Sequence, residues 1–151
     1  MTQATMTALP IDLSPLREQT LCEIERSLKP VQVQDLVADS ATLTQALTLR
    51  LTLVRHDTGI SFEGSLSGEW ELACARCLAP ARLRFNASLD GEAPMSAESF
   101  DASEEARQAL LLALPLNPLC RPECQGLCPI CGVSRNDVKC DCTPAPDRAR
   151  R

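Results

Sequence analysis

The chain is poor in residues that many binding and catalytic sites require. Its 151 residues include no tyrosine, three phenylalanines, one tryptophan and one histidine. Single-stranded RNA is usually held by stacking on aromatic rings, so this scarcity disfavours a stacking surface. The only histidine, His56, lies in a polar turn, where we expect an exposed side chain and no metal ligand. The sequence shows no nucleophile–base pair and no glycine-rich phosphate loop, so we predict no enzyme, no catalytic residue and no small-molecule substrate.

Long apolar runs and targeting signals are also absent from the sequence. No apolar stretch approaches the length of about 18 residues that a membrane span needs. Residues 1–10 lack a basic region followed by an apolar run, so they do not resemble a signal peptide. We therefore expect a cytoplasmic chain that does not enter a membrane. In that reducing compartment, paired cysteines bind metal or do redox work more often than they form disulfides.

Basic charge is sparse over most of the chain. Residues 1–105 carry 8 basic and 16 acidic side chains, whereas residues 106–151 carry 7 basic and 4 acidic ones. The formal net charge is −5. Phosphate affinity rests on clustered Lys and Arg, so a general nucleic-acid binder is not expected. The composition favours protein partners, or RNA that is met inside a larger assembly.

Cysteine is the residue that the chain has in abundance, with nine in all. Eight of them form closely spaced pairs: Cys74, Cys77, Cys120, Cys124, Cys128, Cys131, Cys140 and Cys142. Such pairs are typical of tetrahedral zinc sites, in which each short loop turns two thiolates toward one ion. We predict that these eight residues hold two structural Zn²⁺ ions with no open coordination position. The ninth, Cys22, is expected to be a half-buried, unligated thiol.

The pairing of the cysteines is only partly specified by spacing. The C-x-x-C-G at 128–132 is the most specific fragment, and the C-x-C at 140–142 is its natural partner. The C-x-x-C at 74–77 and the C-x₃-C at 120–124 then remain for a second site. Alternatives join the upstream C-x-x-C to either half of the C-terminal loop, or leave one zinc site and spare thiols. Cys124, Cys128 and Cys131 also match the spacing of a radical-SAM iron–sulfur loop, but such loops lie early in a much larger α/β barrel, so an iron–sulfur cluster is disfavoured.

Hydrophobic periodicity predicts an α+β fold built on an antiparallel meander. Apolar residues alternate with polar ones over 47–53, 60–74 and 81–89, which is typical of strands with one buried face. This places the C-x-x-C at a hairpin tip between two strands. We expect a C-terminal zinc-binding segment packed on the sheet, within a single domain over residues 1–142.

Several shorter segments complete this prediction. Ser14 and Pro15 predict the start of a helix over about 15–28, and Val31 and Val33 an edge strand. A second helix is expected from Ser103, which would cap it. The remaining expectations are a weakly ordered start at 1–13, a solvated acidic loop at 90–105 and a disordered basic tail at 143–151.

The cysteine motifs resemble the C-terminal signature of the YceD family, the large ribosomal RNA subunit accumulation proteins. The resemblance is carried by LPLNPLC (114–120), CQGLCPICG (124–132), Asn136, CDC (140–142) and CARCL (74–78). It covers about residues 60–142. It implies a bacterial or organellar, non-enzymatic factor in large-subunit ribosomal RNA accumulation and processing, and thus in ribosome biogenesis, in which zinc is a scaffold.

The implied partners are the precursor of the large ribosomal subunit, its RNA, or ribosomal proteins. If the chain touches RNA, we expect contacts from the basic residues near the cysteines: Arg76, Arg82, Arg84, Arg121, Arg135 and Lys139. Arg82 and Arg84 have a second interpretation, which is cross-strand pairing with Glu69 and Glu71. The alternative function is a zinc-stapled protein-interaction adaptor without direct RNA contact, which would dock through the acidic segment 90–105.

Overall fold

The computed structural model describes residues 8–37 and 41–143. Their contacts divide the chain into two compact units. The sheet unit comprises Met1–Glu71 and Arg82–Pro115, and the cysteine unit comprises Leu72–Ala81 and Leu116–Arg151. A single domain over 1–142 stays a prediction, and the predicted tail lies outside the described residues from position 144 onward.

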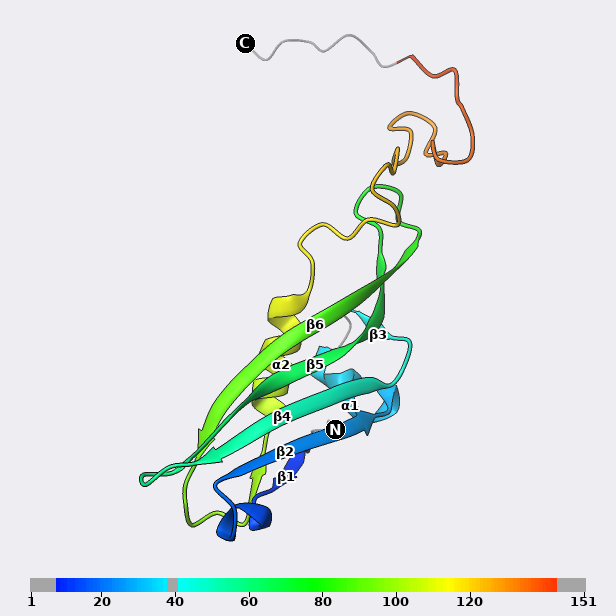
Figure 1. Ribbon diagram of the computed structural model, residues 1–151. Helices are drawn as coiled ribbons and strands as arrows, with labels where there is room; N and C mark the ends of the chain where they lie inside the picture. Colours follow the sequence, from blue (N-terminus) through cyan, green and yellow to red (C-terminus); the bar gives the residue numbers. More distant parts are fainter. Residues whose placement is uncertain (1–7, 38–40, 144–151) are drawn as a thin grey trace, which may run out of the picture. The chain divides into compact units, whose positions relative to one another are not determined.

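The fold is α+β with antiparallel sheets, as predicted (Figure 1). The larger sheet contains β2 (Leu21–Leu28), β3 (Thr42–Leu43), β4 (Leu47–Arg55), β5 (Ile60–Ala73) and β6 (Pro80–Ala93). Its order is β2-β4-β5, with β3 and β6 also paired to β5. The smaller sheet joins β1 (Pro10–Asp12) to β7 (Ser99–Asp101). The helical elements are η1 (Ser14–Arg17), α1 (Pro30–Val37) and α2 (Ser103–Ala113), and no described helix is long and apolar enough to span a membrane.

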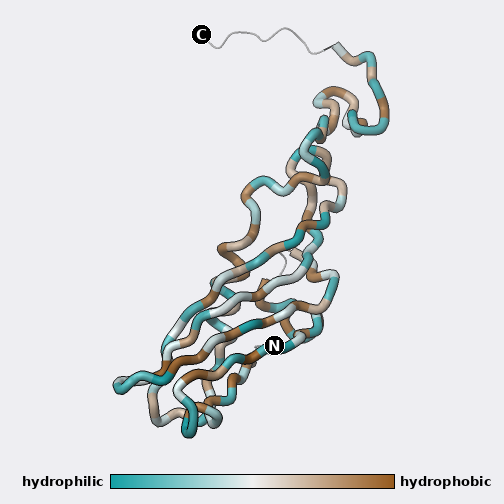
Figure 2. Tube along the Cα trace, viewed as in Figure 1, coloured by the Kyte–Doolittle hydropathy of each residue, from teal (hydrophilic) through white to brown (hydrophobic). Residues whose placement is uncertain are grey.

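The core of the sheet unit lies between one face of the larger sheet and the two α-helices. Four leucines of β4, from Leu47 to Leu53, are at most 2% exposed, while the residues between them are not buried. Figure 2 shows polar positions interrupting the apolar ones along these strands. Trp70 on β5 is 1% exposed and stacks on Phe85 of β6, with 4.1 Å between ring centroids. The predicted strand alternation and the core position of Trp70 are therefore confirmed.

The predicted helix over 15–28 and the edge strand at 31–33 are wrong. Ser14 and Pro15 do start a helical turn, but η1 ends at Arg17. Residues 21–28 form β2, whose eight residues pair in register with β4. This pairing with an existing strand outweighs the weak helical spacing of Leu21 and Ile24. Residues 30–37 form α1, because their buried positions recur at helical and not strand spacing.

The predicted acidic loop at 90–105 is also wrong, because most of it belongs to β6, β7 and α2. Asp101 accepts hydrogen bonds from the backbone N–H groups of Leu9 (2.8 Å) and Ser103 (3.0 Å). These bonds, led by that from Leu9, lower the pKa of Asp101. The helix α2 begins at Ser103 as predicted, but Asp101, and not the Ser103 hydroxyl, accepts a hydrogen bond from a backbone N–H at its start. Residues 10–12 form β1, where the sequence predicted a weakly ordered start.

Candidate metal centre

The connection between β5 and β6 places the first two cysteines on one tight turn. The N–H of Leu78 donates to the Cys74 carbonyl over 3.0 Å, and the N–H of Cys74 donates to the Ala79 carbonyl over 2.8 Å. Leu78 adopts a φ of 62°, the left-handed conformation that glycine prefers. The turn directs both thiols toward residues 120–124, so the predicted hairpin-tip position of the C-x-x-C is confirmed.

The first cluster comprises Cys74, Cys77, Cys120 and Cys124, whose sulfurs all lie within 4.8 Å of one another. The Sγ–Sγ distance is 3.7 Å between Cys74 and Cys124 and 3.6 Å between Cys77 and Cys120. Four sulfurs around zinc at about 2.3 Å stand about 3.8 Å apart in a tetrahedron, whereas disulfide sulfurs stand about 2.05 Å apart. The geometry fits a four-thiolate metal site and excludes disulfides at both of these contacts.

The second cluster comprises Cys128, Cys131, Cys140 and Cys142, again within 4.8 Å. Its first two sulfurs come from one turn, in which the Gly132 N–H donates to the Cys128 carbonyl over 2.9 Å. Gly132 has a φ of +74° and no neighbouring atom that a Cβ would meet, so backbone conformation explains the glycine. The structure thus groups the eight cysteines as the favoured pairing does. That they ligate Zn²⁺ stays a prediction.

Backbone N–H groups aim at several sulfurs of both clusters, and their effect is largest at Cys74 and Cys128. The N–H of Cys77 lowers the pKa of the Cys74 thiol to about 6. The N–H groups of Cys131 and Ile130 likewise lower the pKa of Cys128 to about 6. Each cluster therefore presents at least one thiol that ionises readily, and the thiolate is the form that binds metal.

Other thiols of the clusters shift the opposite way. Desolvation raises the pKa of Cys120 to about 12. Hydrogen bonding to the Cys131 sulfur raises the pKa of Cys142 to about 12. Without metal, each cluster thus keeps some of its thiols protonated. The four sulfurs then repel one another less than four thiolates would. Metal binding at either cluster must release these protons.

The donor set fits zinc or another ion that prefers thiolates. Each cluster offers four sulfurs, and closed four-thiolate sites are of the structural kind, because no position remains for a substrate. The ninth cysteine, Cys22, lies half-buried on β2 and belongs to neither cluster. His56 is exposed, and its Nε2 lies 2.7 Å from the Ser61 hydroxyl. Its exposed position in the turn is as predicted.

Three polar side chains brace the first cluster, and sequence reasoning missed their roles. Asn136 donates from Nδ2 to the Cys124 sulfur over 3.3 Å, which lowers the pKa of Cys124. Arg76 donates to the Cys124 carbonyl over 3.0 Å, and Arg121 donates to the Asn136 carbonyl over 3.3 Å. The only signal for Asn136 was its place among the motif residues of the family resemblance, which did not indicate its partner.

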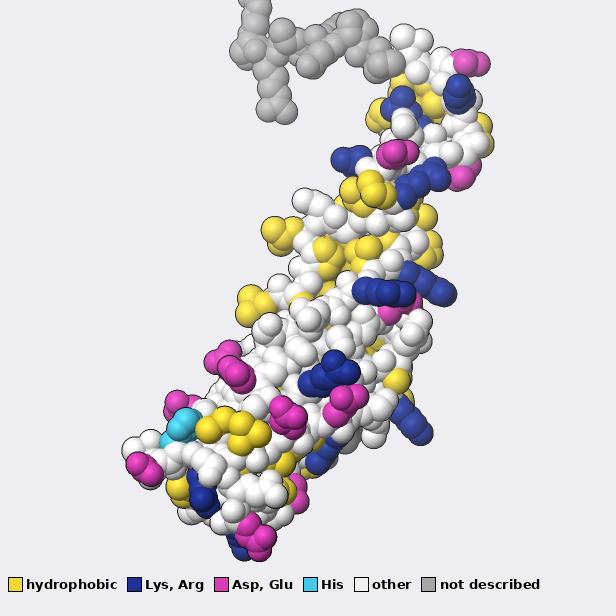
Figure 3. Space-filling model, in the orientation of Figure 1, with side chains coloured by type: hydrophobic (Ala, Val, Ile, Leu, Met, Phe, Trp, Pro, Cys, Tyr) yellow, Lys and Arg dark blue, Asp and Glu magenta, His cyan; other side chains and the backbone are white. Residues whose placement is uncertain are grey.

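The predicted basic contact residues are distributed over both units. Arg76, Arg121, Arg135 and Lys139 lie exposed in the cysteine unit, whereas Arg82 and Arg84 lie on the exposed side of β6 in the sheet unit. Arg82 forms an ion pair with Glu71 at 3.2 Å, which supports its cross-strand interpretation. Figure 3 shows basic side chains interspersed with acidic ones on this face of the molecule.

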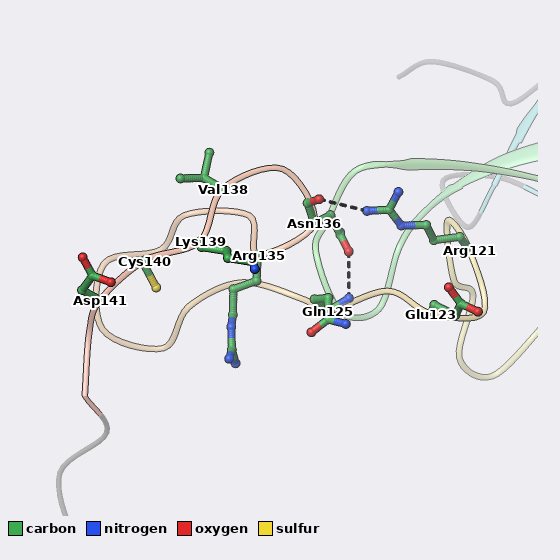
Figure 4. Close-up of a pocket in the computed structure, with 9 residues that line it drawn as sticks. All are labelled: Arg121, Glu123, Gln125, Arg135, Asn136, Val138, Lys139, Cys140 and Asp141. Carbon is green, nitrogen blue, oxygen red and sulfur yellow. Dashed lines mark hydrogen bonds between the residues drawn. The ribbon is translucent and has the colours of Figure 1, made fainter.

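An open depression of about 670 Å³ lies on the cysteine unit. Its charged lining consists of Arg121, Glu123, Arg135, Lys139 and Asp141. Figure 4 shows Asn136 turned toward Gln125 and Arg121, while the Arg135 side chain extends away from the loop. The depression therefore combines three cations with two carboxylates and two amides, which suits binding of a polar surface better than an apolar ligand.

Comparison with known proteins confirms the resemblance. Residues 88–150 match the family described as "Large ribosomal RNA subunit accumulation protein YceD". Uncharacterized proteins of Mycobacterium bovis and Mycobacterium tuberculosis are 32% identical to the chain over 104 residues, covering 58% of it. The chain spans about half the length of these curated relatives, at 50%. No solved structure is a significant match.

Proposed function

We propose that the chain is a non-enzymatic, zinc-stabilised factor that supports accumulation and processing of the large-subunit ribosomal RNA in the cytoplasm. The observation that carries this proposal is the family match over residues 88–150, whose description names that RNA. The matched segment contains six of the eight clustered cysteines. The family match and most of the candidate metal ligands therefore lie in the same part of the chain.

Zinc would serve this function by holding the cysteine unit together. The buried cluster of this unit consists mainly of cysteines, with Ala81, Leu119 and Leu127 as its other members. So small an apolar core leaves the unit only marginally stable without a cross-link, because its burial offsets little more than the conformational entropy of folding. Metal bound by the cysteines adds its binding free energy to folding. The family function would then require metal as scaffold and not as a reagent.

Contact with the ribosomal precursor would run through cations of the cysteine unit. Arg76 and Arg121 already donate to backbone carbonyls, so their removal would also disturb the first cluster. Arg135 and Lys139 are exposed, and their side chains make no hydrogen bond or ion pair to the described residues. These two residues are therefore the cleaner test of contact with phosphate groups.

The first experiment is a sucrose gradient of ribosomal particles from cells depleted of the protein. Fractions from normal cells are probed for the protein itself. Loss of large subunits, with the protein on their precursors, supports the proposal. A normal profile with the protein only in the particle-free fractions contradicts it.

The second experiment reverses charge at the two free cations. The Arg135→Glu, Lys139→Glu variant should bind precursor particles more weakly, and the salt slope of binding should fall by roughly 2. Lys29→Glu is the control, because Lys29 is an exposed cation of the sheet unit and its side chain makes no hydrogen bond or ion pair to the described residues. Equal binding by the variant and the control would remove these cations from the contact.

Exposed apolar residues of the cysteine unit support a second candidate, the protein-interaction adaptor. Leu78 is 67% exposed, Ile130 56% and Val138 53%. Large exposed side chains of this kind are common at protein contacts. Ultraviolet cross-linking separates the candidates, since direct contact predicts RNA cross-links to the chain and the adaptor predicts cross-links to protein only. The acidic segment proposed for docking is folded, so its deletion would destroy the sheets instead of testing this candidate.

A further inference from the structure

The loop that joins the two halves of the second cluster also reaches the first cluster. Asn136 lies in this loop, between Cys131 and Cys140, and its Nδ2 donates to the Cys124 sulfur over 3.3 Å. Its Oδ1 accepts from the backbone N–H of Gln125 over 2.8 Å, as Figure 4 shows. One side chain of the second cluster's loop thus fixes both a sulfur of the first cluster and the backbone next to it.

Backbone pairing sets the position of Asn136. Leu127 and Ser134 form an isolated antiparallel bridge. The N–H of Arg135 donates to the Gly126 carbonyl over 2.9 Å. The chain beyond the second C-x-x-C turn therefore runs back along residues 126–128. This places Asn136, which follows Arg135, opposite the first cluster.

No apolar core holds this loop in place, so its order depends on hydrogen bonds and on the second cluster. Residues 129–143, all of which the structure describes, include no buried side chain. Apolar burial therefore does not order the loop, and hydrogen bonds open to water contribute only about 1 kcal/mol each. Metal held by 128–131 and 140–142 would close the loop at both ends. This step rests on the metal binding that is part of the proposed function.

We propose that Asn136 couples the two clusters, so that metal binding at the second cluster raises the metal affinity of the first. Hydrogen bonds to metal ligands typically change metal affinity by about 10- to 100-fold. Because coupling free energies are reciprocal, loading the first cluster raises the affinity of the second by the same factor. Asn136 is a positioning residue, which acts through Cys124 and not on the metal.

Titration of the full chain with Co²⁺ tests this coupling, because tetrahedral cobalt–thiolate sites absorb visible light. The double variant Cys140→Ser, Cys142→Ser removes two cysteines of the second cluster and keeps all four cysteines of the first. Asn136→Ala and this double variant should each weaken Co²⁺ binding at the first cluster by about 10- to 100-fold. Their combination should lose no more than the double variant alone, since both changes remove the same contact.

Two further variants separate the amide contact from general damage to the loop. Asn136→Asp keeps an oxygen for the Gln125 N–H but loses the donor to Cys124, so it should weaken the first cluster as Asn136→Ala does. Asp137→Ala is the matched control, since Asp137 is the exposed neighbour in the same loop and should keep the wild-type affinity.

Full affinity in Asn136→Ala, or losses that multiply in the combined variant, would overturn the coupling. A wild-type chain without a tetrahedral cobalt–thiolate spectrum would overturn metal binding itself. The titration involves no ribosome, so a failed gradient experiment leaves its result unchanged.

Discussion

Opening the first cluster should destabilise the sheet unit, whereas opening the second should not. The sulfurs of Cys77 and Cys120 lie 3.6 Å apart, although 43 positions separate them in the sequence. The chain between them contains all of β6, β7 and α2, and its residues Arg82–Pro115 belong to the sheet unit. The loop between Cys131 and Cys140 lies wholly in the cysteine unit. Only the first metal cross-link therefore restricts the unfolded states of the sheet unit.

Chain entropy gives the size of the expected effect. A cross-link that closes a loop of 43 residues stabilises the folded state by about 4 kcal/mol, by the relation used for disulfides. A loop of about nine residues gives about 2.5 kcal/mol, which acts on the cysteine unit alone. With a typical urea slope, loss of the first cross-link should lower the unfolding midpoint of the sheet unit by roughly 2 M.

Trp70 reports this unfolding, because it is the only tryptophan and is 1% exposed in the sheet unit. Two double variants are compared. One is Cys120→Ser, Cys124→Ser and the other is Cys140→Ser, Cys142→Ser. Both are measured at zinc concentrations far above either dissociation constant. Urea unfolding followed by tryptophan fluorescence should show the large shift for the first variant alone. Equal shifts in both variants, or none in the first, would refute the reasoning.

Three further predictions concern backbone strain, close packing and pH. Leu78→Gly should raise the free energy of unfolding by about 0.5–1 kcal/mol in urea melts, because relief of the left-handed strain exceeds the entropy that glycine adds to the unfolded chain. A lower free energy of unfolding would show that the Leu78 side chain packs favourably. Gly64→Ala should lower it by about 2 kcal/mol, since a Cβ would collide with the Arg50 carbonyl, and an unchanged midpoint would contradict this. Cys74 and Cys128 have folded pKa values of about 6 against an ordinary 9.0, so their thiolates stabilise the metal-free protein fully above pH 9, and this contribution disappears as pH falls through 6. Chelator-treated protein melted between pH 6 and 9 should therefore gain stability with pH, and a flat or falling profile would contradict the assigned N–H···S bonds.

The strands and the metal-ligand turns could be predicted because their signals are local. A buried strand face repeats every second residue, and the leucines from Leu47 to Leu53 show this without help from other segments. The C-x-x-C turns are equally local, since four or five residues fix both sulfurs and the glycine that follows. Leu78 departs from this pattern, as it takes the left-handed conformation without being glycine.

The elements that were predicted wrongly owe their conformation to distant partners. Residues 21–28 carry apolar residues at spacings that suit a weak helix, but the free edge of β4 offers them eight registered pairs. Segment 90–105 is acidic, yet its middle pairs with β1 and Asp101 bonds to Leu9, which is 92 positions away. Charge alone does not report such long-range bonds, so the sequence indicated a solvated loop.

By itself, the sequence indicated the fold class and a candidate metal chemistry. Eight paired cysteines and alternating apolar residues can be recognised from local spacing, and the cysteine motifs also carry the family resemblance. Only the tertiary structure decided which pairs meet, because Cys74 and Cys124 are 50 positions apart and no local rule joins them. It also decided that Asn136 serves the cluster opposite its own loop. Steric and hydrogen-bonding rules fix local geometry within a few residues. These contacts depend instead on how the tertiary fold brings distant segments of the chain together.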